Sequence, residues 1–176
     1  MRRLAVIAAL GTVLAMLTGV LATSPALAGR GPKWHLVPVR PFTFDARYCG
    51  FGVGVTFPVH HEYTKILKAA DGSMTTLTTG ALTATFTNRR TGKAITENLS
   101  GPGKVTTAPD GSAAITEKGH NGLFFLPADA RRFGLPTLTV TTGPVTESVT
   151  PDGAITALSR HGHILVNICT ALNQAT

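Results

Sequence analysis

The sequence predicts an all-β protein in which a single antiparallel meander closes into a small barrel of about 8–10 strands. A β-sandwich is the alternative. Three observations lead to this fold class. The chain carries 24 threonines after residue 28, and threonine, like valine, favours strands over helices. Turn signals recur along the chain, and the segments between them have the length of strands.

The turn signals are mainly Asp-Gly and Asn-Gly pairs, which tolerate positive φ and favour tight hairpins. The clearest strand between them spans residues 82–87, where Leu82, Ala84 and Phe86 share one face and threonines occupy the other. Residues 138–140 repeat the pattern. Such alternation is typical of an antiparallel sheet with one buried and one solvated face. The turns are predicted at residues 71–72, 88–92, 101–103, 109–111, 121–122 and 151–153.

Residues 1–28 are predicted to be a secretory signal peptide. Arg2 and Arg3 precede an almost unbroken apolar run, and Ala26 and Ala28 are small residues that a signal peptidase accepts. A retained membrane anchor is the alternative, but the cleavage pattern and the lack of charges after it favour removal. We therefore expect a secreted, extracellular protein that begins at Gly29 and has no further transmembrane segment.

The remaining chain is expected to form an extended Pro-rich lead-in (29–48), a β-barrel domain (49–172) and a short tail (173–176). Its composition excludes a coiled coil, a multi-spanning membrane protein and a disulfide-dense miniprotein. The formal charge of +7 falls to about +5 without Arg2 and Arg3. The basic residues are dispersed, which argues against a nucleic-acid partner and leaves weak attraction to an anionic cell envelope. We expect a monomer.

Cys49 and Cys169 are the only cysteines, and we expect them to form a disulfide, since an exported chain meets an oxidising compartment. Two unpaired thiols or a metal site are the alternatives, but the paired spacing of zinc ligands is missing. Cys49 precedes the first predicted strand, 51–59, and Cys169 ends the last, 164–168. A bond between them would hold the first and last strands together, as closure of a lipocalin-like or similar barrel requires.

Three glutamates are the weak catalytic candidates. Glu97, Glu117 and Glu147 each share a strand face with apolar neighbours, so period two places them inside the barrel. An interior carboxylate cluster could bind a cation or basic ligand, or act as an acid–base pair. The alternative is a position at the rim, in water, because burying an unpaired carboxylate is costly. Tyr63 and Lys65 could partner such an acid.

The histidines raise the question of a metal site. His161 and His163 share one face of the last strand, and His60 and His61 follow the first. With the first and last strands paired, these groups would lie on the order of 10 Å apart, too far for shared coordination. We expect the histidines to face solvent, and we expect no metal and no cofactor.

An aromatic segment follows residue 122. Phe124, Phe125 and Phe133 are predicted to lie in the core, although residues 128–136 could instead form a lid over the barrel mouth.

From Cys49 to residue 172 the chain resembles a family of small exported actinobacterial proteins known as hypothetical proteins. The resemblance is carried by HEYTKIL (61–67), LTTGALTATFTNRRTGKAITENLSGPG (77–103) and LPTLTVTTGPV (135–145), of which TNRRTGK and NLSGPG are the most specific parts. That family has no established reaction, ligand or catalytic residue. The resemblance therefore implies export and an all-β fold, and assigns no site.

The sequence contains no G-x-S-x-G, H-E-x-x-H or phosphate-loop motif. We expect a non-catalytic binding module for a small apolar ligand or a cell-envelope component. A small barrel enzyme, an isomerase or hydrolase using the interior carboxylates, is one alternative, and a structural interaction module with a filled core is another. An apolar cavity favours the first, convergent carboxylates the second and a packed interior the third.

Overall fold

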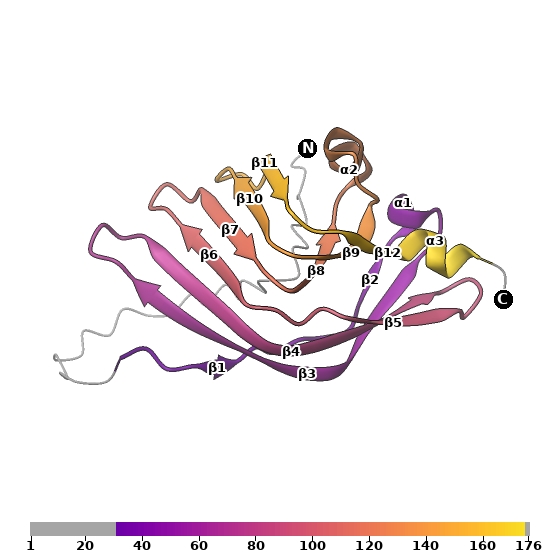
Figure 1. Ribbon diagram of the computed structural model, residues 1–176, viewed down its shortest axis with the longest axis horizontal. Helices are drawn as coiled ribbons and strands as arrows, with labels where there is room; N and C mark the ends of the chain where they lie inside the picture. Colours follow the sequence, from indigo (N-terminus) through magenta and orange to yellow (C-terminus); the bar gives the residue numbers. More distant parts are fainter. Residues whose placement is uncertain (1–30, 175–176) are drawn as a thin grey trace.

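The computed structural model describes residues 31–174, so the predicted signal peptide and the last residues of the predicted tail lie outside the described residues (Figure 1). The chain forms two antiparallel sheets. The elements are β1 (His35–Leu36), β2 (Phe42–Phe44), α1 (Ala46–Cys49), β3 (Val53–Lys68), β4 (Met74–Asn88), β5 (Ala94–Asn98), β6 (Gly103–Thr107), β7 (Ala113–Glu117), β8 (His120–Phe124), α2 (Pro127–Phe133), β9 (Leu138–Thr142), β10 (Val145–Val149), β11 (Ile155–Arg160), β12 (Ile164–Asn167) and α3 (Ile168–Asn173).

The large sheet has nine strands in the order β1-β3-β4-β6-β7-β10-β11, with β2 added on β3 and β5 on β4, and the small sheet has the order β12-β9-β8. Within residues 31–174 neither sheet closes on itself, because β1 and β11 end the large sheet without pairing with each other. The predicted closed barrel is therefore wrong, and the sandwich-like alternative fits better. The last strand, β12, pairs with β9 of the small sheet rather than with the first long strand.

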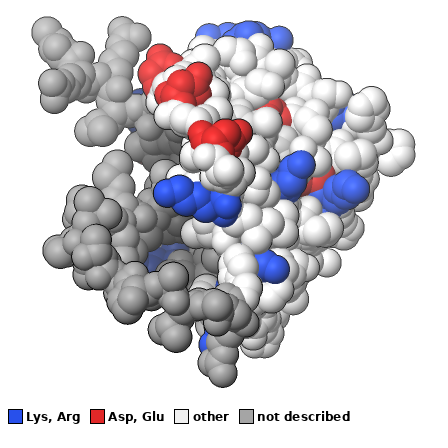
Figure 2. Space-filling model, turned by 90° about the vertical axis from the view of Figure 1, so that its left-hand side faces the viewer, with Lys and Arg blue, Asp and Glu red and all other residues white. Residues whose placement is uncertain are grey.

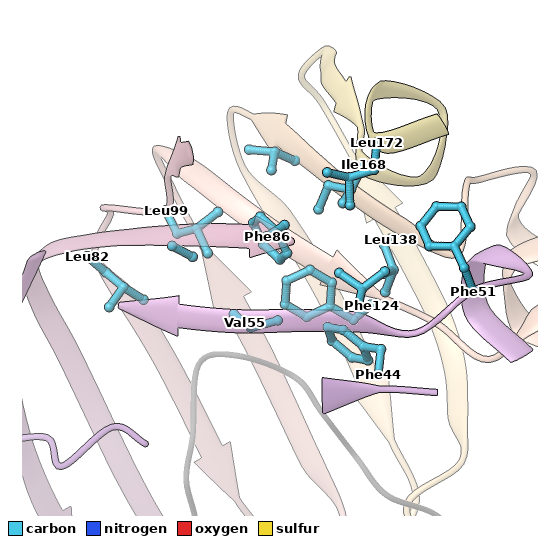
Figure 3. Packing of buried hydrophobic residues seen from close by; sticks show 13 residues of the cluster. Phe44, Phe51, Val55, Leu82, Phe86, Leu99, Phe124, Leu138, Ile168 and Leu172 are labelled. Carbon is cyan, nitrogen blue, oxygen red and sulfur yellow. The ribbon is translucent and has the colours of Figure 1, made fainter. Parts of the chain in front are cut away.

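The small sheet lies at one end of the large one, with β2, β3 and β4 on one side of it and β10 and β11 on the other (Figure 1). One face of the small sheet meets β2, β3 and β4 in the main core, shown in Figure 3. The other face meets β10, β11 and α2 in a second cluster. The main core contains Phe44, Phe51, Val53, Val55, Leu82, Ala84, Phe86, Leu99, Phe124, Leu138, Val140, Ile168 and Leu172, and the second contains Leu123, Phe125, Ala130 and Val145.

Strand β4 confirms the predicted alternation, since Leu82, Ala84 and Phe86 are buried and the intervening threonines are half-buried. Strand β9 departs from it. Thr139 is as completely buried as Leu138 and Val140, because both faces of the small sheet are covered. The predicted solvated face at residues 138–140 is therefore wrong, and the Thr139 hydroxyl donates to the carbonyl of Val166 instead of to water.

Three of the predicted turns form matching hairpin tips, at residues 69–73, 108–112 and 150–154, and in each a glycine adopts a φ between 86° and 88°. The tips stand side by side: a side-chain carbon at Gly111 would lie 3.4 Å from Pro151. Acidic side chains gather at this end of the molecule (Figure 2). The Asn121-Gly122 turn is wrong, since both residues lie inside β8 and the chain turns at Gly119.

Cys49 and Cys169 form the predicted disulfide, with their Cα atoms 5.1 Å apart. The prediction that this bond joins the first and last strands of a barrel is wrong. Cys49 ends the short helix α1, and Cys169 lies in the first turn of α3, so the bond joins two helices and not two paired strands. The lead-in is also more structured than expected, because β1, β2 and α1 lie within residues 35–49.

The aromatic residues after β8 confirm the core prediction. Phe124 and Phe125 are buried, and Phe133 is half-buried with its ring 5.9 Å from that of Phe125. The segment that could have formed a lid is instead helix α2, which starts at Pro127 and ends at Phe133, with Gly134 as its left-handed cap.

A bulge in β3 decides which side chains face the concave side of the large sheet. Between Thr56 and Val59 the register with β4 shifts by one residue, and Pro58, which has no N–H to donate, lies within this irregularity. Val53 and Val55 face the core before the bulge. After it the even-numbered residues face the concave side of the sheet, because His60 stands opposite the buried Leu82.

Candidate functional site

The candidate site lies on the concave face of the large sheet, beyond the packed core. The register of four neighbouring strands brings Thr78, Gly103, Glu117 and Val145 into one row across this face. Gly103 has no side chain, and a Cβ placed on it would meet only the Cβ of Thr78, at 3.8 Å. The missing side chain leaves a hollow directly beside the carboxyl group of Glu117.

Glu147 lies two residues beyond Val145 on β10, opposite Ile115, and so is a diagonal neighbour of Glu117. Diagonal residues on adjacent strands lie roughly 7–8 Å apart and interact through long side chains. Glu147 is only 8% exposed. Its strand alternates strictly, with Val145 and Val149 buried beside it and Thr146 exposed. The predicted inward orientation of Glu147 is therefore confirmed.

Glu62 is a third carboxyl group at this site, and the sequence pattern did not predict it. The bulge in β3 turns Glu62 to the concave face, where it lines the same pocket as Glu117. The pocket holds about 30 Å³ of space, room for about two water molecules. Its lining comprises Glu62, Thr78, Leu99, Gly101, Pro102, Gly103, Lys104, Val105, Ile115, Glu117, His120, Asn121 and Gly122.

Burial raises the pKa values of these carboxyl groups because charge is costly away from water. The pKa of Glu117 rises to about 8, through burial first and then through the neighbouring Glu147 and Glu62. The pKa of Glu147 rises to about 7, and that of Glu62 also rises, both through burial. At neutral pH Glu117 is therefore mostly an uncharged acid, which can donate a hydrogen bond as well as accept one.

The carboxyl groups lack a cationic partner within the described residues, where the one ion pair joins Arg47 to Asp45 on the surface. Arg160 lies in the same row as Glu117, opposite Val145, but its guanidinium donates to the carbonyl of Gly162. The burial of Glu117 and Glu147 is thus uncompensated by any charge that the described chain supplies.

Glu97 is placed differently. It shares the inner face of β5 with Ile95, as predicted, but it does not line the pocket that holds Glu117 and Glu62. Burial raises the pKa of Glu97, and the nearby His120 opposes that rise. Of the three predicted glutamates, the structure therefore brings Glu117 and Glu147 together and leaves Glu97 apart.

Tyr63 and Lys65 do not partner these acids, and that prediction is wrong. Both lie on the convex face of β3, because the bulge reverses the parity that the unbroken sequence implies. The ammonium group of Lys65 lies 6.0 Å from the centre of the Trp34 ring. Pro58 is the one sequence signal that marks the irregularity.

The histidines meet the expectation in part. His161 and His163 are exposed. His60 is half-buried, and its Nε2 atom is buried with no hydrogen-bond partner among the described residues, so the expected solvent-facing position is wrong for His60. The bulge explains this too, because it turns His60 inward. Within residues 31–174 no group of three or more histidine, cysteine, aspartate or glutamate side chains is arranged to hold a metal ion.

Apolar side chains extend the site toward the hairpin tips. Ile66 on β3 and Met74 on β4 are 54% and 43% exposed, and Val105 and Ile115 are half-buried on the neighbouring strands. The register places Ile66, Val105 and Ile115 in one row on the concave face. The result is an open surface that is apolar toward the tips and carries carboxyl groups at its inner end.

These features define a class: an open, curved antiparallel sheet, closed at one end by a second sheet, with carboxyl groups on its concave face. No described helix is long and apolar enough to cross a membrane. No protein-family model, curated protein or solved structure matches the chain. The resemblance to small secreted actinobacterial proteins therefore stays a prediction.

Proposed function

We propose that this protein is an exported, non-catalytic binding module whose concave face takes a small, largely apolar ligand carrying one hydrogen-bonding or basic group. One observation carries the proposal: the half-buried Glu117 and the buried Glu147 are diagonal neighbours without a cationic partner among the described residues, on a face that also carries exposed apolar side chains. Apolar surface with a few convergent polar groups is typical of small-molecule sites.

The energetics support a role for a ligand at the carboxyl groups. Burying a carboxyl group that has no partner lowers the stability of the folded state. Groups with strongly raised pKa values occur preferentially at functional sites. A ligand hydroxyl or amine at the hollow beside Gly103 would supply the missing hydrogen bonds to Glu117. Hydrogen bonds from the bound ligand would thus offset the free-energy cost of burying the carboxyl groups.

The shape of the site limits where the ligand lies. The hollow beside Gly103 has room for about two water molecules, so it suits a head group and not a whole ligand. The body of the ligand then lies on the open surface of Ile66, Val105 and Ile115. An elongated amphiphile fits this arrangement better than a compact apolar molecule.

Export is the second part of the proposal. The disulfide between Cys49 and Cys169 is typical of proteins that fold in oxidising compartments, and the sequence of the first 28 residues has the pattern of a signal peptide. Intact-mass measurement on culture supernatant tests this. We expect a chain that begins at Gly29, and a secreted chain that retains the first 28 residues would contradict the cleavage.

Ligand binding is tested with three twelve-carbon probes: dodecylamine and dodecanoate, each below its micelle concentration, and dodecanol below its solubility limit. We expect the amine and the alcohol to shift the methyl NMR signals of Ile66, Val105 and Ile115, and the carboxylate to bind at least tenfold more weakly at pH 8, because a second anion meets the acids.

Gly103→Val is the decisive variant, because the valine side chain fills the hollow. It should weaken the binding of dodecylamine and of dodecanol at least tenfold. Thr79→Val, on the convex face, is the matched control and should bind normally. The proposal fails if no probe shifts the concave-face signals or if Gly103→Val binds as tightly as the wild type. Absence of all binding would favour the structural module.

A small enzyme is the second candidate, because two adjacent acids with pKa values near neutrality can exchange a proton with a substrate. Chromogenic ester and glycoside substrates test it. Turnover that is lost in both Glu117→Gln and Glu147→Gln would replace the binding proposal with a hydrolase. Turnover that survives both changes comes from a contaminant or from another site.

A further inference from the structure

The convex face of the large sheet carries a second surface with a different character. Trp34, Leu36 and Tyr63 are 46%, 51% and 43% exposed, although side chains of this size are usually buried. We call this surface, with the basic residues around it, the convex patch. It consists of Lys33, Trp34, Leu36, Val59, Tyr63, Lys65 and Lys104.

Strand pairing holds these side chains on one face. Leu36 stands opposite Tyr63, and Val59 lies on the same side of β3 because it is four residues from Tyr63, beyond the bulge. The Lys65 ammonium group lies over the Trp34 ring at 6.0 Å. Lys65 and Lys104 flank Leu77 on the two sides of β4. The patch is therefore an array on a rigid sheet, extended by β1 (Figure 1).

Charge is segregated between the two faces. The chain has nine acidic residues, and in the described structure none of them lies on the convex face of the large sheet. The four glutamates occupy inner-face positions of their strands. The aspartates lie at the three hairpin tips, at the start of α1 and in α2.

This chemistry fits an anionic lipid surface. Tryptophan and tyrosine are enriched where a membrane meets water, because each combines an apolar ring with a polar group. Lysine stems cover apolar surface while their ammonium groups reach the headgroups. A second copy of the chain fits less well, because face-to-face pairing would bring the Lys65 and Lys104 side chains of both copies together without an acid to separate them.

We infer that the convex patch docks this protein on an anionic lipid bilayer, with Trp34 and Leu36 in the interfacial layer and the lysines on the headgroups. The concave face then points away from the membrane and stays open to its ligand. The docking does not depend on the carboxyl groups of the ligand site, since the aromatic and apolar side chains of the patch lie on the opposite face of the sheet. Lys104 is the one residue of the patch that also lines the pocket.

Trp34 is the only tryptophan, so its fluorescence reports on the patch directly. The disulfide-bonded chain lacking residues 1–28 is titrated with vesicles of phosphatidylcholine alone and with vesicles containing 30% phosphatidylglycerol. We expect the emission to shift to the blue only with vesicles that contain phosphatidylglycerol. In 0.5 M NaCl the apparent affinity for these vesicles should fall at least tenfold. Phosphatidylglycerol vesicles with brominated acyl chains should quench Trp34 in the wild-type protein.

Two variants and a control separate the patch from general charge. Leu36→Ser, and the double variant Lys65→Gln with Lys104→Gln, should each weaken vesicle binding at least tenfold. Arg131→Gln with Lys93→Gln removes the same charge elsewhere and should bind within twofold of the wild type.

Failure to bind anionic vesicles, or equal loss in the patch variants and the control, would overturn the inference. A blue shift that grows with protein concentration without lipid would assign the patch to self-association instead. Quenching of the wild type by brominated lipid needs no variant, so a misfolded variant leaves the test decisive.

Discussion

Replacing Glu117 by Gln should stabilise the folded protein at alkaline pH and change little at pH 5. Glutamine keeps the size and hydrogen-bonding capacity of the protonated acid but cannot ionise. In the wild type, burial raises the pKa of Glu117 from 4.5 to about 8. The folded state therefore holds the proton more tightly than the unfolded state, and stability falls as pH rises from about 4.5 to about 8.

The size of the effect follows from the shift. Each pKa unit corresponds to about 1.4 kcal/mol, so the wild type has a ceiling of about 3.5 kcal/mol of lost unfolding free energy between pH 5 and pH 8. The pocket is open to water, which weakens desolvation, and we expect about 2 kcal/mol. With a urea dependence of about 2 kcal/mol per molar, that is a midpoint difference of about 1 M at pH 8.

Urea unfolding of wild type and Glu117→Gln at pH 5, 6, 7 and 8, with the disulfide intact, measures this difference. Asp129→Asn, in α2 and away from the concave face, is the control for the loss of one carboxylate. If wild type and Glu117→Gln keep the same midpoint difference at every pH, Glu117 is not desolvated. Carboxyl titration by NMR gives the same answer directly, since an ordinary value near 4 for Glu117 would remove the electrostatic basis of the site.

Reduction of the disulfide, or Cys49→Ser, should lower the melting temperature, because a bond across 120 residues contributes up to about 4–5 kcal/mol by restricting the unfolded chain; an unchanged melting temperature would show that the unfolded state is already compact. Gly122→Ala should cost about 1–3 kcal/mol, because the added carbon would lie 2.7 Å from the Phe124 ring, whereas Gly31→Ala has open space and should unfold like the wild type in urea. Phe86→Ala empties a fully buried site and should cost about 3–5 kcal/mol by thermal or urea unfolding, and a cost under 1 kcal/mol would contradict its central place in the core.

Local chemistry made part of this fold predictable. The alternation of Leu82, Ala84 and Phe86 reports one buried face whatever the strand pairs with. The tips at Asp71, Asp110 and Asp152 depend on hydrogen bonds within five residues. Such features need no knowledge of distant segments.

Long-range pairing accounts for the failures. Asn121-Gly122 has strong turn chemistry, but the amide of Asn121 donates to the carbonyl of Gly143, and Gly122 provides room for the Phe124 ring inside β8. Tertiary contacts therefore override the local preference. The prediction of barrel closure failed for the same reason. Strand β12 pairs with β9 because of contacts within the small sheet and its core, and no local sequence pattern encodes those contacts.

The candidate site shows both outcomes. Period two placed Glu117 and Glu147 on the inner face, since their strands are regular over five residues. Glu62 was not predicted to face the site, because one extra residue near Pro58 reverses the orientation of every later position on β3. A single bulge thus exchanged Glu62 for Tyr63 and Lys65 at the site.

The bond between Cys49 and Cys169 makes most of the domain a covalent ring. The hairpin tips at residues 69–73, 108–112 and 150–154 all lie inside that ring, and all are exposed segments that a protease can reach. A single cut at any tip opens the ring without releasing a fragment, and the neighbouring strands stay paired. Nicked protein should therefore migrate as two pieces only after reduction, and a chain whose new ends lie at a tip should still find the same sheet order.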